Sequence, residues 1–382
     1  MIPATTTAQA RRSDVGRSQA AQIGHPAEPH QWHRLRSRPS RLGRGQTCEL
    51  PGAVRVWPLA CDSVLTVVTI TMSPSVDYTL TIPRMVPEEK LRAHVEAIEP
   101  GGGGVQVARA LRQLDEPVEA VVALGGDTGS TLHNLLSTEG VPVHQIRVRA
   151  NTRPSLTMFV EDQQVNFRIV GEAGRQAPEE WSQVLDRLRE FDSLPPYIVL
   201  SGSFPPGVPN SLVGDIAELC REQNSRLVFD GSGEALEVAV EAKADLIKPS
   251  KEELAALVGE DGYDPDFDYR GAAQKIIDRG VPRLVVSLGG AGTYVLANFG
   301  DEARLRPPKV KVASTVAAGD STVAGIVAGL TRGLPLIDAV RLGTACGTGT
   351  CLHRGSQLFT AEDVRTILPQ IQVDRIHEAI PH

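Results

Sequence analysis

The stretch RLVFDGSGEALEVAVEAKADLIKPS, residues 226–250, contains the pattern that decides the fold. The apolar piece RLVF ends in a loop of small residues, a helical stretch follows, and a second apolar piece, ADLI, ends in another polar loop. Comparable strand-like pieces lie at 65–72, 120–124, 197–203 and 283–290. Buried apolar strands that alternate with helices indicate a mostly parallel sheet covered by helices on both faces. We therefore predict an α/β fold that binds ligands at the carboxyl ends of the strands, where the Gly- and Ser-rich loops lie.

Four further segments alternate between apolar and polar residues, as strands with one solvated face do. They are DYTLTIP, RAHVEAIEP, SLTMFVED and VNFRIVG, at 77–83, 92–100, 155–162 and 165–171. We expect them to form a small antiparallel β lid beside the main sheet, built from segments near 77–100 and 155–171. The main domain is expected to span 63–375, followed by a C-terminal tail at 376–382.

The first 60 residues differ from the rest of the chain because they hold nine arginines against three acidic residues and lack apolar periodicity. We expect residues 1–62 to be a disordered basic N-terminal extension. The whole chain has a net charge of −7 and a pI of about 5.8, so nothing global indicates a nucleic-acid partner. No apolar stretch approaches the roughly 20 residues of a membrane span. The five cysteines form no CxxC pair, and reduced thiols in a cytoplasmic protein are expected.

The sequence EPGGGGVQVARALRQL, residues 99–114, places four glycines between a strand and a helix. Glycine lets the backbone approach a ligand closely, and the following helix N-terminus favours an anion or polar hydroxyl groups. We predict a ligand-binding loop here, with a flexible turn as the alternative. The loop is not a Walker A motif, because no GK[ST] follows it.

The sequence VASTVAAGDSTVAG, residues 312–325, places one carboxylate, Asp320, among small residues where a helix begins. Free backbone N–H groups at a helix start can hold a developing negative charge, and a carboxylate beside them can accept a proton from an attacking hydroxyl group. This combination suits phosphoryl transfer, which depends on positioning and charge stabilisation. The alternative is that Asp320 only caps the helix.

Two further loops each have two interpretations. In LIKPSKEELAALVG, residues 246–259, Ser250 and Glu253 fit a capping box that needs no functional explanation. The functional interpretation places Lys248 near a nucleotide phosphate and Glu253 near a metal-bound water. The sequence SLGGAGTYVL, residues 287–296, fits either a cover over a nucleotide or a plain hairpin.

From about residue 65 to about residue 372, these loops together resemble the PfkB, or ribokinase-like, carbohydrate kinases, and within them the phosphofructokinases. The motifs occur in family order: SPSVD, EEKLRAHVEAIEPGGGGVQVARAL, SGSFPPGV, VFDGSGEAL, IKPSKEEL, VVSLGGAG and STVAAGDSTVAG. The resemblance implies a ribokinase-like fold and the ATP-dependent phosphorylation of a ketohexose phosphate. Fructose 6-phosphate is the leading acceptor, and fructose 1-phosphate and tagatose 6-phosphate are the alternatives.

The resemblance also implies roles around the sugar. Asp320 would be the catalytic base that deprotonates the primary hydroxyl group of the sugar. The sugar itself would be held by Ser75, Asp77, Gly101, Gly102, Gly103, Gly104, Gln106 and Ser203. From the residues alone, Asp77 fits the end of a strand as well as it fits a sugar ligand. The sugar phosphate would be bound by Arg153 and by Lys90 of the partner subunit, in a homodimer joined through the lid sheets.

On the nucleotide side, the resemblance implies an anion hole formed by Ala317, Ala318 and Gly319. The ATP site would be lined by Lys248, Ser250, Ser287, Gly289 and Gly292. Glu253 would organise Mg²⁺ through water. A monovalent-cation site for K⁺ would lie near Ser314, Val316 and Gly355.

Three positions depart from the family pattern. Ala317 replaces the first glycine of the usual G-A-G-D loop, Gln106 replaces an asparagine after the glycines, and Ser250 replaces the asparagine of N-x-x-E. A Cβ at residue 317 can crowd a phosphate or strain a backbone angle that suits glycine. From sequence, Ala317→Gly is expected to raise kcat modestly and to lower stability by ~0.5–1 kcal/mol. Because all three departures bear on ligands, a catalytically weak sugar-phosphate-binding sensor is the alternative from another functional class.

Overall fold

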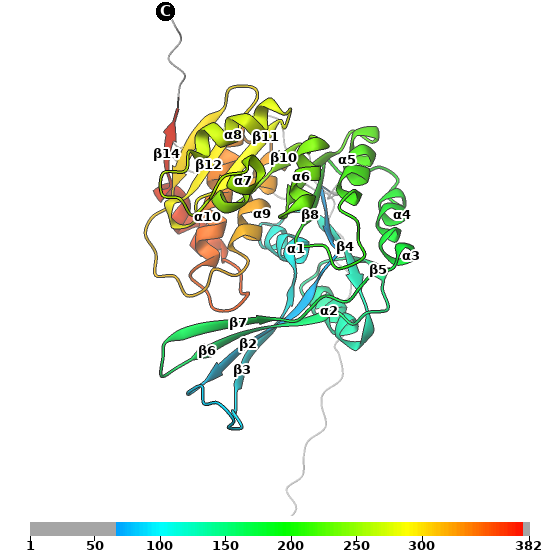
Figure 1. Ribbon diagram of the computed structural model, residues 1–382, viewed down its shortest axis with the longest axis vertical. Helices are drawn as coiled ribbons and strands as arrows, with labels where there is room; N and C mark the ends of the chain where they lie inside the picture. Colours follow the sequence, from blue (N-terminus) through cyan, green and yellow to red (C-terminus); the bar gives the residue numbers. More distant parts are fainter. Residues whose placement is uncertain (1–65, 377–382) are drawn as a thin grey trace, which may run out of the picture. The chain divides into compact units, whose positions relative to one another are not determined.

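The computed structural model describes residues 66–376 (Figure 1). The predicted basic extension at 1–62 and residues 377–382 of the predicted tail lie outside the described residues. Those two predictions therefore stay predictions.

Within residues 66–376, the main sheet has ten strands and is mostly parallel, as predicted (Figure 1). Seven parallel strands follow one another in the sheet: β5 (Val143–Arg147), β4 (Val118–Leu124), β1 (Val67–Thr71), β8 (Tyr197–Ser201), β9 (Arg226–Asp230), β10 (Leu246–Ile247) and β11 (Arg283–Ser287). Three antiparallel strands complete the far edge: β12 (Thr293–Ala297), β13 (Glu302–Arg306) and β14 (Gln372–Arg375). The connection from β11 to β12 is a hairpin, and the role of SLGGAGTYVL as a cover over a nucleotide stays a prediction.

Helices cover both faces of this sheet, because successive strand residues point to opposite sides. In β1, Val67 belongs to one hydrophobic cluster, whereas Val68 and Ile70 belong to the other. The first cluster packs against α1 (Gly103–Gln113), α2 (Gly126–Thr138), α9 (Ala318–Thr331), α10 (Leu336–Thr350) and α11 (Ala361–Ile367). The second packs against α3 (Pro178–Trp181), α4 (Gln183–Arg189), α5 (Leu212–Glu222), α6 (Glu234–Glu241), α7 (Lys251–Val258) and α8 (Tyr269–Asp278).

The lid is a separate four-stranded sheet (Figure 1). Its strands, in spatial order, are β3 (His94–Gly101), β2 (Ser75–Ile82), β6 (Arg153–Val160) and β7 (Val165–Val170). The prediction of an all-antiparallel lid is wrong for the central pair, because β2 and β6 run parallel. The physical reason is their origin. Each leaves the carboxyl edge of the main sheet, β2 just after β1 and β6 just after β5, so both point away from the sheet in the same direction.

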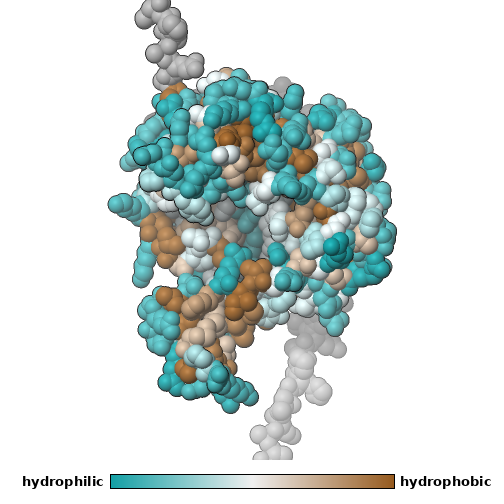
Figure 2. Space-filling view, in the orientation of Figure 1, coloured by the Kyte–Doolittle hydropathy of each residue, from teal (hydrophilic) through white to brown (hydrophobic). Residues whose placement is uncertain are grey.

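The two faces of the lid differ in chemistry. The register pairs Asp77 with Ser155, which places their side chains on one face. It pairs Tyr78 with Ile98 and Leu156, and Leu156 with Ile169, on the other face. Ile98 and Ile169 are 44% and 53% exposed, and Figure 2 shows apolar side chains gathered over the lid. The lid therefore presents a polar face to the site described below and leaves an apolar face uncovered within the described residues.

Candidate active site

A pocket of about 270 Å³ lies where the lid strands leave the carboxyl edge of the main sheet. Its lining includes ten of the residues predicted for ligand binding or catalysis: Ser75, Asp77, Gly102, Gly103, Gln106, Arg153, Ser203, Ala317, Gly319 and Asp320. Val316, predicted near a monovalent cation, also lines it. Six further lining residues were not predicted from the sequence: Ser73, Ser155, Arg168, Val170, Gly202 and Thr315.

The glycine loop joins β3 to α1 at the edge of this pocket. Gly102 has a φ of 106°, which side-chain-bearing residues rarely adopt. A Cβ on Gly101 would overlap the carboxylate of Asp77, so glycine there makes room for that side chain. Ser75 Oγ donates a hydrogen bond of 2.6 Å to Asp77 Oδ1, and both residues are buried. Asp77 lies inside β2 with its carboxylate at the pocket, so the alternative that it ends a strand is wrong.

The start of α9 also contributes to the pocket lining. The helix begins at Ala318, as the position of Asp320 in the sequence predicts. Ala317 precedes it with φ 60° and ψ 5°, in the left-handed region. Ala318 N donates to Thr315 O at 3.3 Å, whereas the N–H groups of Gly319 and Asp320 belong to the first turn, where intrahelical acceptors are missing. The N-cap residue of α9 is Ala317, and Asp320 is the third helical residue, so Asp320 does not occupy the N-cap position.

Asp320 lines the pocket and belongs to a partly buried polar group. Ser201 Oγ donates to Asp320 Oδ1 at 3.2 Å, and Lys248 Nζ lies 3.0 Å from Asp230 Oδ1. Burial and the negative charge of Asp230 raise the pKa of Asp320 to about 7, although Lys248 opposes the shift. Burial disfavours the Lys248 ammonium, but the carboxylates of Asp230 and Asp320 outweigh it and raise the Lys248 pKa. The group therefore combines a fixed cation with a carboxyl group that can exchange a proton near neutral pH.

Ser201 and Asp230 were not selected from the sequence, although both lie in quoted motifs, SGSFPPGV and VFDGSGEAL. Each is the last residue of a parallel strand, β8 and β9. A polar residue at the end of a buried strand was the available signal, because such strands end at the ligand-binding edge.

Two arginines also line the pocket. Arg153 is half-buried at the start of β6, and Arg168 lies on β7. Burial, together with the nearby positive charge of Arg168, lowers the pKa of Arg153, against the opposing effect of Asp77. Two adjacent cations in a pocket favour an anionic ligand group. Lys90 is exposed in the connection between β2 and β3 and does not line this pocket.

The residues predicted to line the ATP site, Lys248, Ser250, Ser287, Gly289 and Gly292, are not part of this pocket lining. Ser287 ends β11, while Gly289 and Gly292 form the turn to β12 with φ of 57° and 101°. A Cβ built on Gly319 would lie 3.6 Å from Lys248 Nζ, so Lys248 adjoins the predicted anion hole.

Ser250 and Glu253 form the predicted capping box of α7, and their functional roles stay predictions. Ser250 N donates to Glu253 Oε2 at 2.8 Å, and Glu253 N donates to Ser250 Oγ at 3.1 Å. The box fixes the direction of α7 at the carboxyl edge of the sheet.

The three residues predicted near a monovalent cation come together through one side chain. Ser314 Oγ donates to Gly355 O at 2.9 Å and accepts from Val316 N at 3.2 Å. This contact ties the segment before α9 to the loop after α10. Among the described residues, no three His, Cys, Asp or Glu side chains gather in a way that would bind a metal ion directly.

The described helices include none that is long and apolar enough to cross a membrane.

Comparison with known proteins assigns the class. The model of the pfkB family carbohydrate kinases matches residues 66–363, and the chain belongs to this family. It is 36% identical to the ATP-dependent 6-phosphofructokinase isozyme 2 of Escherichia coli strain K12, over 78% of this chain and 96% of that protein. It is 32% identical to the 1-phosphofructokinase of Bacillus subtilis strain 168, over 81% and 99%.

Solved structures show the same similarity. The crystal structure of phosphofructokinase-2 from Escherichia coli in complex with potassium matches with a TM-score of 0.75 and 36% identity, covering 80% of this chain and 99% of that one. The same enzyme in complex with fructose 6-phosphate matches with a TM-score of 0.74 and 35% identity, with the same coverage. The predicted family and fold are therefore confirmed.

Proposed function

We propose that this protein transfers the γ-phosphoryl group of ATP to a ketohexose phosphate, converting fructose 6-phosphate to fructose 1,6-bisphosphate. The observation that carries the proposal is the placement of Asp320. Its carboxyl group, with a pKa raised to about 7, lies in the first turn of α9 and lines a pocket that also presents Arg153 and Arg168. A sugar-phosphate kinase needs a base, a helix N-terminus to stabilise the transferred phosphoryl group, and cations to bind the phosphate of the sugar.

In the proposed reaction, Asp320 takes the proton of the sugar's primary hydroxyl group. The hydroxyl oxygen bonds to the γ-phosphorus of ATP as the bond to the β,γ-bridging oxygen breaks, and ADP leaves. The developing charge on the transferred group would be held by the N–H groups of Ala317, Ala318 and Gly319 at the helix start, with Ala318 N exchanging its 3.3 Å hydrogen bond to Thr315 O for the transferred group. Lys248, which keeps its charge beside Asp230, stabilises the same region.

The nucleotide would bind across Ser250, Ser287, Gly289 and Gly292, where a flexible glycine turn meets the end of β11. Mg²⁺ would arrive with ATP and neutralise phosphate charge. Oxygen ligands and retained waters suit Mg²⁺. The capping box uses Glu253 Oε2, so the second oxygen of this carboxylate remains able to accept a hydrogen bond from a metal-bound water.

K⁺ is proposed at the Ser314, Val316 and Gly355 segment. The hydrogen bonds of Ser314 Oγ with Gly355 O and Val316 N hold the three residues together and support the proposal. The potassium complex of the Escherichia coli relative, which covers 80% of this chain, gives further support.

On the sugar side, we propose that Ser75, Asp77, Ser203 and the glycine loop bind hydroxyl groups, with Gln106 completing the set. Arg153 would bind the phosphate that the substrate already carries. Fructose 1-phosphate and tagatose 6-phosphate are the alternative acceptors, because the same polar groups would suit them. A sugar-phosphate sensor without turnover is the alternative from another class, and the intact group around Asp320 argues against it.

We further propose that two copies pair through the apolar face of the lid. This face includes Val95, Ile98, Val165, Phe167 and Ile169, each at least 40% exposed. An exposed apolar sheet face rimmed by polar residues favours association with another protein surface. Pairing would bring the partner subunit's Lys90 toward a pocket that the chain's own Lys90 does not line. Phe167→Asp should convert a dimer to a monomer in analytical ultracentrifugation, and an unchanged dimer would contradict the proposal.

The experiment for the reaction is an ADP-release assay over a panel of ketose and aldose phosphates, with and without Mg²⁺. The proposal expects the highest kcat/KM with fructose 6-phosphate, dependence on Mg²⁺, and loss of activity in Asp320→Asn. Preference for another ketohexose phosphate would select an alternative acceptor. Binding of sugar phosphates without ADP release would favour the sensor.

A further inference from the structure

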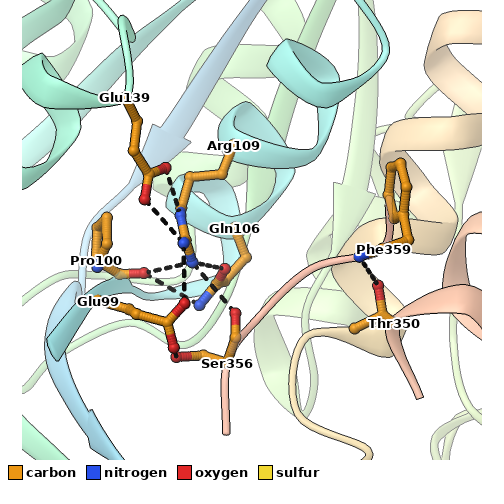
Figure 3. Close-up of polar contacts among 8 residues, drawn as sticks. All are labelled: Glu99, Pro100, Gln106, Arg109, Glu139, Thr350, Ser356 and Phe359. Atoms are coloured by element: carbon orange, nitrogen blue, oxygen red, sulfur yellow. Dashed lines mark hydrogen bonds and ion pairs between the residues drawn. The ribbon is translucent and has the colours of Figure 1, made fainter. Parts of the chain in front are cut away.

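Arg109 lies on α1, close to Gln106 in the sequence, and is 7% exposed. Its guanidinium group reaches two carboxylates from different segments (Figure 3). Nε and Nη2 donate to the two oxygens of Glu139, at the end of α2, over 2.7 and 2.9 Å. Nη2 also donates to Glu99 Oε1, on lid strand β3, at 3.3 Å. One buried cation thus joins the base of the lid to the helix layer.

The third nitrogen, Nη1, serves uncharged acceptors. It donates to Gln106 Oε1 at 2.8 Å, to Pro100 O at 3.2 Å and to Ser356 O at 3.3 Å (Figure 3). Every guanidinium nitrogen therefore has a protein acceptor. An arginine whose donors are all engaged in this way has none left for a ligand, so Arg109 can affect the site only through the groups it holds.

The most direct of these groups is the Gln106 side chain, which lines the pocket. A guanidinium can only donate and a carbonyl can only accept, so the amide of Gln106 has one allowed orientation. Its oxygen faces Arg109, and its nitrogen donates to Pro100 O at 3.1 Å. The amide nitrogen keeps one further N–H group. Held in this way, Gln106 can donate to a sugar hydroxyl oxygen.

The loop after α10 is anchored by other contacts as well. Ser356 Oγ donates to Glu99 Oε2 at 3.1 Å, and Gly355 O accepts from Ser314. Further along, Phe359 N donates to Thr350 Oγ1 at 3.3 Å (Figure 3). Without Arg109, these contacts of the loop after α10 would remain, whereas the Gln106 oxygen would lose its cationic partner.

We propose that Arg109 is a positioning residue for the sugar-phosphate site. It locks the orientation of the Gln106 amide and fixes the end of β3, from which the glycine loop begins. The inference rests on the proposed function, because it assigns Arg109 a role in binding the sugar phosphate of that reaction. It makes a selective prediction: sugar-phosphate binding should depend on Arg109, and ATP binding should not.

The test compares Arg109→Met and Arg109→Lys with a matched control, Arg332→Met. Arg332 also pairs with a buried carboxylate, Glu116, and bonds the backbone at the other end of α1, at Leu114. Arg109→Met should raise KM for fructose 6-phosphate roughly tenfold or more, with KM for ATP changed less than about twofold. Arg109→Lys keeps a charge beside both glutamates and should fold readily. It should still raise the sugar-phosphate KM, because the single ammonium group of lysine cannot replace the planar guanidinium, whose nitrogens reach several acceptors at once. Arg332→Met should change neither KM.

A double-mutant cycle identifies the route of the effect. If Arg109 acts through Gln106, the sugar-phosphate KM of Gln106→Ala should rise little further when Arg109→Met is added. If the two substitutions together raised this KM by the product of their separate factors, Arg109 would not act through Gln106. Unchanged sugar-phosphate KM in both Arg109 variants would overturn the inference, even if their melting temperatures fall. A native protein that neither releases ADP with any sugar phosphate nor is stabilised by one in a thermal-shift assay would refute the proposed function, and the inference with it.

Discussion

Replacing Ala317 by glycine tests how the start of α9 is built. Ala317 has φ 60° and ψ 5°, is 8% exposed and lines the pocket, so both its backbone and its methyl group are constrained. The left-handed conformation brings the Cβ of an L-residue close to the following carbonyl oxygen, at a cost of roughly 1–2 kcal/mol. Alanine also lacks the side-chain hydrogen bond by which asparagine or aspartate offsets this cost.

The observed backbone angle reverses the expectation from sequence for the stability of Ala317→Gly. Glycine removes the strain but gains about 0.4–1 kcal/mol of conformational freedom in the unfolded chain. The difference leaves a net stabilisation of roughly 0.5 kcal/mol, because the relief of strain is the larger effect. In a domain of this size that corresponds to a rise in melting temperature of about 1–2 °C. Removing the methyl group also frees space for the transferred phosphate, so we expect kcat to rise modestly, since ~1 Å of misplacement can cost about 10²-fold.

The assay is kcat under saturating ATP and fructose 6-phosphate, together with the melting temperature, for native protein, Ala317→Gly and the control Ala318→Gly. Ala318 is the first helical residue of α9, where glycine relieves no strain and should destabilise by roughly 0.5–1 kcal/mol. Ala317→Gly should melt higher than Ala318→Gly. If the two variants were equally destabilised, or if Ala317→Gly lowered kcat, the argument from strain at residue 317 would be refuted.

Four further outcomes are expected. Asp320→Asn should lower turnover by ~10²–10⁴ or more with little change in substrate affinity, and near-normal turnover would show that Asp320 is not the base. Because the base must be deprotonated, kcat/KM should fall as the pH drops through about 7. Asp230→Asn removes a neighbouring negative charge, so the pH at which kcat/KM falls should become lower. The same pH profile in Asp230→Asn would disprove the effect of Asp230 on the pKa of Asp320. Arg153→Ala should weaken sugar-phosphate binding far more than ATP binding, and equal use of fructose and fructose 6-phosphate by the native protein would count against this role. Deleting residues 1–60 should leave melting temperature and activity nearly unchanged, and a large loss of either would place that segment on the fold.

The long apolar strands could be predicted from the sequence because burial on both faces leaves a continuous hydrophobic run. The strands β13 and β14 were missed, since Glu302–Arg306 and Gln372–Arg375 are short and carry charges. Their pairing depends on a register across about 70 residues of chain, which no local pattern encodes. The same limit applies to the lid, where the alternation predicted the strands but not the parallel pairing of β2 with β6.

For the candidate site, motifs that combine glycine with polar residues were informative, because they lie at strand ends that the fold brings together. Asp320, Asp77 and Arg153 line one pocket although they are far apart in the sequence. The role of Arg109 was not predictable from the sequence. In the sequence it is one polar residue of an amphipathic helix, and only the packed structure shows that it joins four segments. The departure from glycine at residue 317 did raise the possibility of backbone strain from the sequence, but only the structure gives the left-handed angle that decides between strain and crowding of the phosphate.

The most direct test of the account is to identify the product. Purified protein is incubated with MgATP and fructose 6-phosphate, and the reaction is followed by ³¹P NMR, with Asp320→Asn as the control. We predict that ADP and fructose 1,6-bisphosphate form in equal amounts, and that Asp320→Asn forms them at least ~10²-fold more slowly. ATP hydrolysis to ADP and free phosphate without a sugar bisphosphate, or equal rates for the two proteins, would contradict the account.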